Sequence, residues 1–194
     1  MNKEICLSTN NKNKLKEYRE LLSPLGYVIY CPNDLNIDLQ VNENGKTYRE
    51  NSYLKALALS KLVSFPVIAD DSGLEIKSLD NFPGLYSARF ELECGSYQKA
   101  YQEIFSRLEG KNREARFVCC ICYLESSTSK PLYFEGEVKG EITKQAHGTN
   151  GFGYDPIFFC KENNKYFGLI SEEEKNKISH RYKASKKLAL FLAI

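Results

Sequence analysis

Two adjacent aspartates are the clearest candidates for chemistry in this sequence. Asp70 and Asp71 directly follow the apolar segment Pro66–Ala69. Like charges at the end of a buried strand are costly unless a cation or several hydrogen bonds offset them. Magnesium prefers one or two carboxylates plus water and substrate phosphates, so Asp71 with a carboxylate such as Glu43 suits Mg²⁺. The alternative is an Asp-Ser-Gly turn between strands, and the role of Asp70 stays open.

A polar run between a predicted strand and a predicted helix suits a phosphate group. Backbone N–H groups, hydroxyl and amide side chains, and lysine ammonium groups at a helix N-terminus all favour an anion. The run contains no glycine and is therefore not a Walker loop. The alternative is an ordinary solvated helix start with a capping side chain. The run consists of Thr9, Asn10, Asn11, Lys12, Asn13 and Lys14.

Two clusters in the last third of the chain suit a nucleobase. Glycines bracket Phe152 and Tyr154, and such a loop brings backbone close to a ligand while a ring stacks on a base, at about 1–3 kcal/mol per base. Lys175, His180 and Arg181 have the groups to pair with phosphate or to hydrogen-bond a base edge. The alternatives are a turn with inward-packed aromatics and a basic helical surface.

Covalent catalysis is not expected from the histidines of the chain. The sequence has two, His147 and His180, and neither lies in a recognisable nucleophile motif. The remaining chemistry is direct attack by a metal-activated water, with lysines and magnesium neutralising the developing phosphate charge.

Seven cysteines form no evident disulfide framework. Cys119, Cys120 and Cys122 lie in an apolar run, and no second well-spaced Cys/His pair accompanies them as a zinc site requires. We expect reduced thiols that pack as small hydrophobic side chains.

Length and composition predict one globular domain spanning residues 1–194, with 42% apolar and 27% charged residues. A formal charge of +2 argues against a surface for nucleic acid or another polyanion. No window approaches the roughly 18 uncharged apolar residues of a membrane span. We therefore expect a cytoplasmic protein that binds neither nucleic acid nor membrane.

The elements that must position these clusters mix strands and helices, which predicts an α/β domain with a mixed sheet. An apolar pattern predicts strands at residues 5–7, 27–30, 66–69, 115–124, 132–138 and 141–142. Residues 74–76 are either a hairpin partner of strand 66–69 or its continuation. Helical spacing predicts helices at residues 14–22, 48–64, 101–108 and 172–192, the last begun by a capping box at Ser171 and Glu174.

Together the clusters resemble the inosine triphosphate pyrophosphatase family, house-cleaning enzymes for unwanted purine nucleotides. Six segments match in order along nearly the whole chain. They are Thr9-x-Asn11-x-x-Lys14-x-x-Glu17, Glu50-Asn51-Ser52-x-x-Lys55-Ala56, Ala69-Asp70-Asp71-Ser72-Gly73-Leu74, Pro83-Gly84-x-x-Ser87-Ala88-Arg89, Gly151-Phe152-Gly153-Tyr154-Asp155-Pro156, and Glu173-Glu174-Lys175 to Ser179-His180-Arg181. Asn10 departs from the glycine of many members, and asparagine tolerates a left-handed backbone best among the other residues.

The resemblance implies a two-lobed α/β fold around a long twisted mixed sheet, a substrate cleft between the lobes, and a homodimer. It implies hydrolysis of ITP, dITP and XTP to the monophosphate and pyrophosphate, with at least one Mg²⁺ per subunit. Asp71 would accept the proton of the attacking water, and Glu43 and Asp71 would bind the metal. The substrate would contact Thr9, Asn10, Asn11, Lys12, Asn13, Lys14, Lys55, Ser72, Phe152, Gly153, Tyr154, Asp155, Lys175, His180 and Arg181.

Substrate choice has a physical basis in the 6-oxo group and N1–H of hypoxanthine and xanthine, which adenine lacks. A site built to hydrogen-bond one group rejects an analogue without it by about 10⁴-fold. The competing hypotheses are a broad nucleoside triphosphate pyrophosphatase, a nucleotide sensor without turnover, and a structural domain whose polar loops are surface turns.

Overall fold

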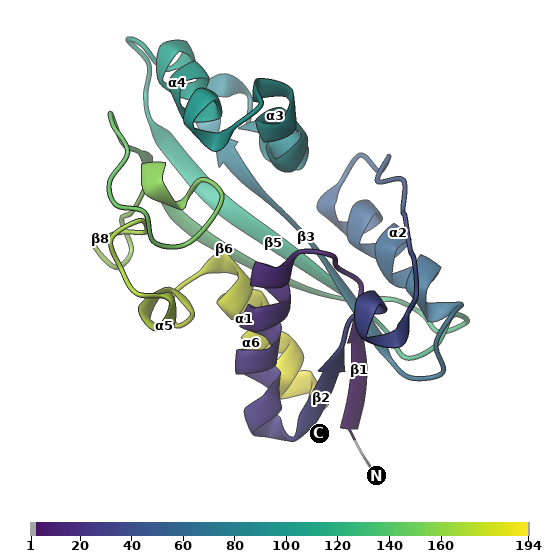
Figure 1. Cartoon of the computed structure of the whole chain (residues 1–194). Helices are drawn as coiled ribbons and strands as arrows, with labels where there is room; N and C mark the ends of the chain where they lie inside the picture. The colour runs from purple at the N-terminus through teal and green to yellow at the C-terminus, as the bar shows by residue number, and fades with distance from the viewer. Residues whose placement is uncertain (1–2, 194) are drawn as a thin grey trace. The chain divides into compact units, whose positions relative to one another are not determined.

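The computed structural model describes residues 3–193, and within them eight strands form one mixed sheet flanked by helices (Figure 1). The strand order is β2-β1-β3-β5-β6-β7-β8, and β4 pairs with β3. β1 is parallel to β2 and β3, whereas the β3–β4, β6–β7 and β7–β8 pairs are antiparallel. The strands are β1 (Lys3–Leu7), β2 (Tyr27–Tyr30), β3 (Val67–Ile76), β4 (Phe82–Pro83), β5 (Glu114–Leu124), β6 (Leu132–Ile142), β7 (Phe158–Cys160) and β8 (Lys165–Tyr166).

The helices begin at identifiable caps. The side chains of Asn11, Thr47 and Ser96 accept hydrogen bonds from the first-turn N–H groups of α1, α2 and α4, which satisfies donors that the helix leaves open. Across residues 3–193, no helix is both long and apolar enough to cross a membrane. The helices are α1 (Lys12–Leu22), α2 (Tyr48–Ser60), α3 (Ser87–Cys94), α4 (Tyr97–Arg107), α5 (Glu172–Lys175) and α6 (His180–Leu192).

The chain divides into two compact units whose boundaries fall inside β3, β5, β6 and α6. Unit 1 contains Met1–Asp71, Cys119–Gly136 and Tyr182–Ile194. Unit 2 contains Ser72–Val118 and Glu137–Arg181.

Within unit 1, strands β1 and β3 have buried residues on both faces, and alternate residues lie in two separate clusters. One cluster joins Ile5, Leu7 and Ile68 to α1 and α6, while the other joins Cys6, Val67 and Ala69 to α2. This alternation follows from the two-residue period of a strand. Continued along β3, it directs the next two side chains, those of Asp70 and Asp71, to opposite faces. Asp70 follows Ile68 toward α1, and Asp71 follows Ala69 toward α2.

Unit 2 has a core of its own, with several aromatic rings. Leu74 and Ile76 of β3 pack with Ile104 of α4 and with Phe117 and Phe158 of the sheet. α3 contacts α4, as Figure 1 shows. The sequence pattern did not predict α3, a short helix that begins directly after the 3₁₀ turn Gly84–Tyr86 and has no side-chain cap.

The prediction that Asp70 and Asp71 end a strand or form a turn is wrong. Residues 67–76 form one strand, so residues 74–76 continue it. Gly73 does not adopt a positive φ, and the strand stays extended through it. Lysines from both faces reach the aspartates, which removes the physical reason to end the strand at a pair of charges.

Two further boundaries differ from the prediction. Strands 132–138 and 141–142 are one strand, in which a side chain at Gly140 would come within 2.7 Å of the Phe158 ring and collide with the Phe159 carbonyl. The predicted helix 172–192 is two helices, because Ile178 and Ser179 both donate to the Lys175 carbonyl and the chain turns there. The capping box of Ser171 and Glu174 is confirmed.

Smaller differences concern helix ends and one loop residue. α1 begins two residues before the predicted helix, at Lys12, because Asn11 supplies the cap. α2 ends at Ser60, four residues before the predicted end at residue 64. Asn10 is not among the non-glycine residues with positive φ, so its loop needs no left-handed backbone there.

The cysteines yield a prediction that needs no substrate. Cys94 is half-buried, whereas the other six cysteines are buried. Burial raises the pKa of Cys6 and Cys122 to about 12 and that of Cys120 to about 11, which makes thiolate scarce at neutral pH. A thiol reagent added to the native protein should react rapidly with one thiol and with the others only after denaturation. More than one rapid equivalent would contradict this packing.

Candidate active site

The polar loop between β1 and α1 is a capped helix start that carries Lys14. Asn11 accepts hydrogen bonds from the N–H groups of Asn13, at 2.9 Å, and Lys14, at 3.2 Å. Thr9 accepts one from Asn11 N–H at 3.1 Å. The capped start, the alternative to a phosphate site, is therefore present. Asn10 to Asn13 are exposed, and they remain accessible to an anion at the helix N-terminus.

Two lysines of unit 1 approach the aspartates from different helices. Lys14 of α1 contacts Asp70 Oδ1 at 3.0 Å. Lys55 of α2 has its ammonium 3.0 Å from Glu43 Oε2, 3.8 Å from Asp71 Oδ1 and 2.7 Å from the backbone carbonyl oxygen of Asp70. The structure thus brings together five residues from four separate parts of the sequence, and the predicted pair Glu43 and Asp71 shares one cation.

Asn51 is a residue of this cluster whose role the sequence did not indicate. Its side-chain oxygen accepts a hydrogen bond from Gly45 N–H at 2.8 Å, and its side chain also bonds to Asp71. Asn51 is 3% exposed. A side chain at Gly45 would lie 2.7 Å from the Asn51 oxygen, so this position accepts only glycine without displacement. Asn51 therefore fixes the loop that carries Glu43 relative to Asp71.

Burial and charge pairing shift the pKa values of Asp71 and Lys55 in opposite directions. Burial raises the pKa of Asp71 above its ordinary value, the ammonium groups of Lys55 and Lys14 act against this shift, and Glu43 adds to it. Burial alone would lower the pKa of Lys55, but the carboxylates of Asp71, Asp70 and Glu43 outweigh it and raise this pKa. A carboxylate with a raised pKa binds a proton more readily than an exposed one, as a proton acceptor must.

Glu43 and Asp71 fit magnesium by their donor chemistry. Among residues 3–193, no group of three or more His, Cys, Asp or Glu side chains is placed to hold a metal ion. Magnesium does not need such a group, since it takes one or two carboxylates and completes its shell with water and phosphate oxygens. The Glu43 and Asp71 oxygens already converge on one cation, the Lys55 ammonium, within 4 Å. Both are hard oxygen donors of the required kind.

Unit 2 contains the second candidate cluster, organised around the buried carboxylate of Asp155. Its Oδ2 lies 2.6 Å from the Lys175 ammonium and accepts a hydrogen bond from Phe152 N–H at 2.9 Å. Asp155 is 2% exposed and Lys175 is 3% exposed. A side chain at Gly151 would collide with the same carboxylate oxygen, and Gly151 also has a φ of +74°. Gly151 is thus required for the loop to close over Asp155.

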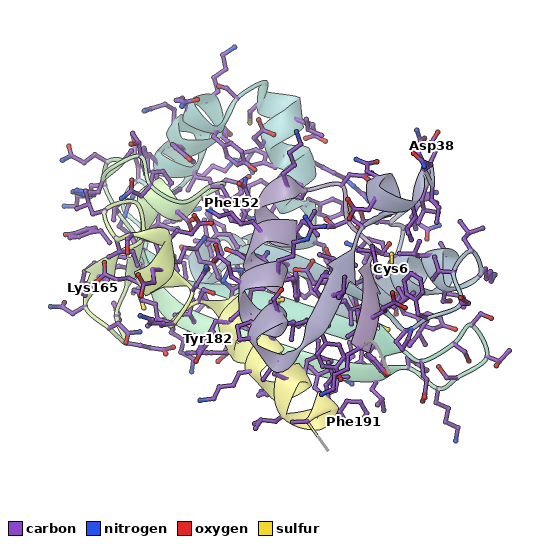
Figure 2. All side chains as sticks on the ribbon, turned by 60° about the horizontal axis from the view of Figure 1, so that its bottom comes forward. Cys6, Asp38, Phe152, Lys165, Tyr182 and Phe191 are labelled. Atoms are coloured by element: carbon purple, nitrogen blue, oxygen red, sulfur yellow. The ribbon has the colours of Figure 1, made fainter. Side chains whose placement is uncertain are left out.

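The ring of Phe152, labelled in Figure 2, lies beside two cations. The Lys175 ammonium is 4.2 Å from the ring centre, and the Arg181 guanidinium carbon is 5.7 Å from it. The structure therefore brings three predicted base-binding residues together, all of them in unit 2. Because the Phe152 ring is half-buried, part of it remains accessible for stacking.

Tyr154 has a different environment from Phe152. It is 4% exposed, its hydroxyl donates to the Ser87 carbonyl at 2.6 Å, and its ring packs against Tyr97 with centroids 5.3 Å apart. The hypothesis that its ring offers a stacking surface is therefore wrong, and the inward-packed alternative holds for this residue. The Tyr101 hydroxyl donates to the Gly153 carbonyl and anchors the same loop, a contact that no sequence motif indicated.

His180 and Arg181 are also more buried than a basic helical surface would be. His180 is 5% exposed and its ring stacks on Phe117, with centroids 4.9 Å apart and planes 14° apart. Arg181 is 2% exposed and donates to the Ser72 hydroxyl at 3.2 Å. Ser72 immediately follows Asp71 in β3, so the chain itself joins the two clusters.

Known proteins resemble this chain along almost its full length. The family model described as the Ham1 family matches residues 5–191. A Bacillus subtilis dITP/XTP pyrophosphatase is 40% identical over 194 residues, covering 98% of this chain and 97% of the relative. A Haemophilus influenzae dITP/XTP pyrophosphatase is 42% identical over 188 residues, covering 95% of this chain and 96% of the relative.

Solved structures agree with the sequence comparisons. A HAM1 protein from Coxiella burnetii superposes with a TM-score of 0.90 at 34% identity, covering 98% of each chain. The Staphylococcus aureus Ham1 protein gives a TM-score of 0.87 at 38% identity, also over 98% of each chain. The mixed sheet and its flanking helices are therefore those of these proteins.

Proposed function

Because this chain belongs to the Ham1 family, we propose that it is a magnesium-dependent pyrophosphatase for dITP, ITP and XTP. It hydrolyses these purine nucleotides to the monophosphate and pyrophosphate, and so prevents their incorporation into DNA and RNA. The observation that carries the proposal is the convergence of Lys55 on Glu43, Asp70 and Asp71, with Lys14 on Asp70. Such a set of lysines and carboxylates suits a phosphate chain and its metal.

In this proposal unit 1 handles the phosphate chain. Lys14 and Lys55 pair with phosphate oxygens, and exposed groups of the run from Thr9 to Asn13 surround the rest of the chain. Glu43 and Asp71 would hold Mg²⁺, which when bound neutralises phosphate charge and lowers the pKa of water. Asp71 accepts the proton of the attacking water, a role supported by the raised pKa that burial gives it.

In the same proposal unit 2 handles the nucleoside. The Phe152 ring stacks on the base, and Lys175, His180 and Arg181 supply donors for its edge. A donor directed at the 6-oxo group accepts hypoxanthine and xanthine and leaves adenine mismatched. Asp155 pairs with Lys175 and holds its ammonium group beside the Phe152 ring. Ser72, Gly153 and Tyr154 belong to this part of the site through Arg181 and through the loop backbone.

We further propose that one nucleotide engages both clusters in a cleft between two lobes. Its support is the chain itself, since Asp71 and Ser72 are consecutive residues of β3. On this proposal residues 1–194 act as one functional domain. The proposal also includes a cytoplasmic homodimer.

The products test the proposed reaction directly. Phosphorus NMR of a reaction with dITP and Mg²⁺ should show pyrophosphate and dIMP appearing together in equal amounts. Orthophosphate with dIDP would instead indicate cleavage of the terminal phosphate and would contradict the proposal. A magnesium-free reaction is the control, and it should show no turnover.

Phe152→Ala tests the nucleoside part of the site. Lost stacking of about 1–3 kcal/mol per base should raise the KM for dITP, by about tenfold for each 1.4 kcal/mol. Binding of inorganic tripolyphosphate, which has no base, should not change. Leu169→Ala, at a side chain of unit 2 that is 57% exposed, is the control. An unchanged KM for dITP in the Phe152 variant would exclude stacking on this ring.

A further inference from the structure

Asp70 lies beside the proposed proton acceptor but has different surroundings. We infer that Asp70 is a positioning residue, which holds the Lys14 and Lys55 ammonium groups where they meet the phosphate chain. It neither accepts a proton from water nor binds the metal. The inference rests on the proposed function, since it assigns a task within that site.

The acceptor atoms of Asp70 are engaged by unit 1 itself. Oδ1 lies 3.0 Å from the Lys14 ammonium, and Oδ2 accepts the Cys119 thiol at a sulfur–oxygen distance of 3.6 Å. The backbone carbonyl accepts the Lys55 ammonium at 2.7 Å. Asp70 is 1% exposed. A carboxylate so enclosed has no accessible oxygen for an attacking water, whereas the side chains of Lys14 and Lys55 are 17% and 14% exposed.

The strand geometry separates the two aspartates. Ile68 and Cys119 pack in the cluster of α1 and α6, whereas Val67 and Ala69 pack in the cluster of α2. Asp70 therefore faces α1 with Lys14, and Asp71 faces α2 with Lys55. Two carboxylates on opposite faces of one strand do not converge on one metal ion. This division leaves the metal to Asp71 and Glu43, while the Asp70 carboxylate pairs with Lys14 and the Asp70 backbone carbonyl accepts from Lys55.

The pairing has a consequence for catalysis. An unpaired lysine side chain samples many rotamers, and ordering it costs side-chain entropy. The Asp70 carboxylate holds Lys14 in one arrangement before the substrate arrives. The Asp70 carboxylate also cancels one positive charge in the site, which lowers the affinity for the pyrophosphate product. Without Asp70, the site should bind anions at least as well but position them worse.

Asp70→Asn should therefore lower kcat without lowering the affinity for anions. We expect kcat for dITP to fall by on the order of 10²-fold, the scale of a small misplacement in an active site. The inhibition constant of pyrophosphate should stay the same or decrease, and the magnesium concentration at half-maximal rate should not change. Glu20→Gln is the matched control, because it removes an exposed carboxylate that pairs with Lys16 on α1. That control should leave all three quantities unchanged.

The double variant Lys14→Ala/Asp70→Asn keeps the pair neutral and tests the coupling. If Asp70 acts through Lys14, the double variant should be no slower than Lys14→Ala alone. It should also have a higher Tm than Lys14→Ala, which leaves the buried Asp70 charge without this partner. Additive rate losses would overturn the inference. The inference would also be overturned if Asp70→Asn raised the magnesium concentration at half-maximal rate by about tenfold or more, as loss of a metal ligand would.

Tripolyphosphate binding and dITP turnover, measured separately, distinguish a wrong role for Asp70 from a wrong function for the chain. Tripolyphosphate affinity, measured by calorimetry without turnover, should not fall in Asp70→Asn and should fall in Lys14→Ala. A loss of affinity in Asp70→Asn would overturn the inference even if the wild type hydrolyses dITP. A wild type that binds tripolyphosphate but releases no pyrophosphate from dITP would overturn the proposed function instead. An unchanged kcat in a folded Asp70→Asn variant would overturn the positioning role alone.

Discussion

Asp71→Asn should lower kcat for dITP by about 10²–10⁴-fold, the usual contribution of a general base. Asparagine has nearly the same shape but accepts no proton, and it gives the metal a weaker ligand. The fold should survive. Burial raises the pKa of Asp71, so its ionised form costs stability once the pH exceeds that pKa. The amide variant should therefore unfold at the same or a higher temperature than wild type at neutral pH without Mg²⁺.

The control for this variant is another carboxylate of β3. Glu75 is buried and pairs with Arg116 at 2.7 Å, in unit 2 and apart from the lysines of unit 1. Glu75→Gln should keep kcat within about twofold of wild type, a rate difference of roughly 0.4 kcal/mol. Wild-type activity should also fall as the pH drops through the raised pKa of Asp71, because only the carboxylate accepts a proton. Near-normal turnover by Asp71→Asn would remove Asp71 from the mechanism.

Asp155→Ala should have the largest effect on stability. The change leaves the Lys175 ammonium buried without this partner and removes the acceptor of Phe152 N–H. Breaking a buried ion pair from one side typically costs about 3–5 kcal/mol. For a chain of this size, Tm should fall by about 2–4 °C per kcal/mol. Thermal unfolding followed by circular dichroism measures the change.

An exposed ion pair of unit 2 provides the comparison for Asp155. Lys77 and Glu114 lie 3.3 Å apart with side chains 74% and 53% exposed. Such pairs contribute about 0–1 kcal/mol, so Glu114→Gln should barely change Tm. Equal Tm values for Asp155→Ala and Glu114→Gln would mean that the Asp155–Lys175 pair does not stabilise unit 2.

The sequence predicts most elements of this fold because its apolar residues follow strand and helix periods. It misplaces the acidic pair, because two charges in a row normally end a buried strand. The compensating charges come from Lys14 and Lys55, and Lys14 lies 56 residues away from Asp70. Contacts over such separations depend on the tertiary fold, and no local pattern encodes them. Once β3 is known to be continuous, its two-residue period assigns Asp70 and Asp71 to different faces.

The candidate site shows the same division between local and tertiary information. Residue types and glycine spacing single out the loop around Phe152. These sequence features do not distinguish Phe152 from Tyr154, since both residues are aromatic. Tyr154 is buried only because it packs against Tyr97 and Ser87 in the folded chain. Asn51 and Tyr101 lie on helices whose patterns look ordinary, although both fix loops of the candidate site. Their roles follow from where α2 and α4 lie, which the sequence pattern does not specify.

Pyrophosphate release from dITP, XTP, dGTP and dATP, each with and without Mg²⁺, is the most direct test of whether this chain is a magnesium-dependent pyrophosphatase for dITP and XTP. We expect metal-dependent release from dITP and XTP, little from dATP, which lacks the 6-oxo group, and little from dGTP only if the site leaves no room for its 2-amino group. Equal rates on all four nucleotides would contradict the assigned base specificity. No release from any of them, despite magnesium-dependent binding of dITP, would contradict the assignment of a pyrophosphatase.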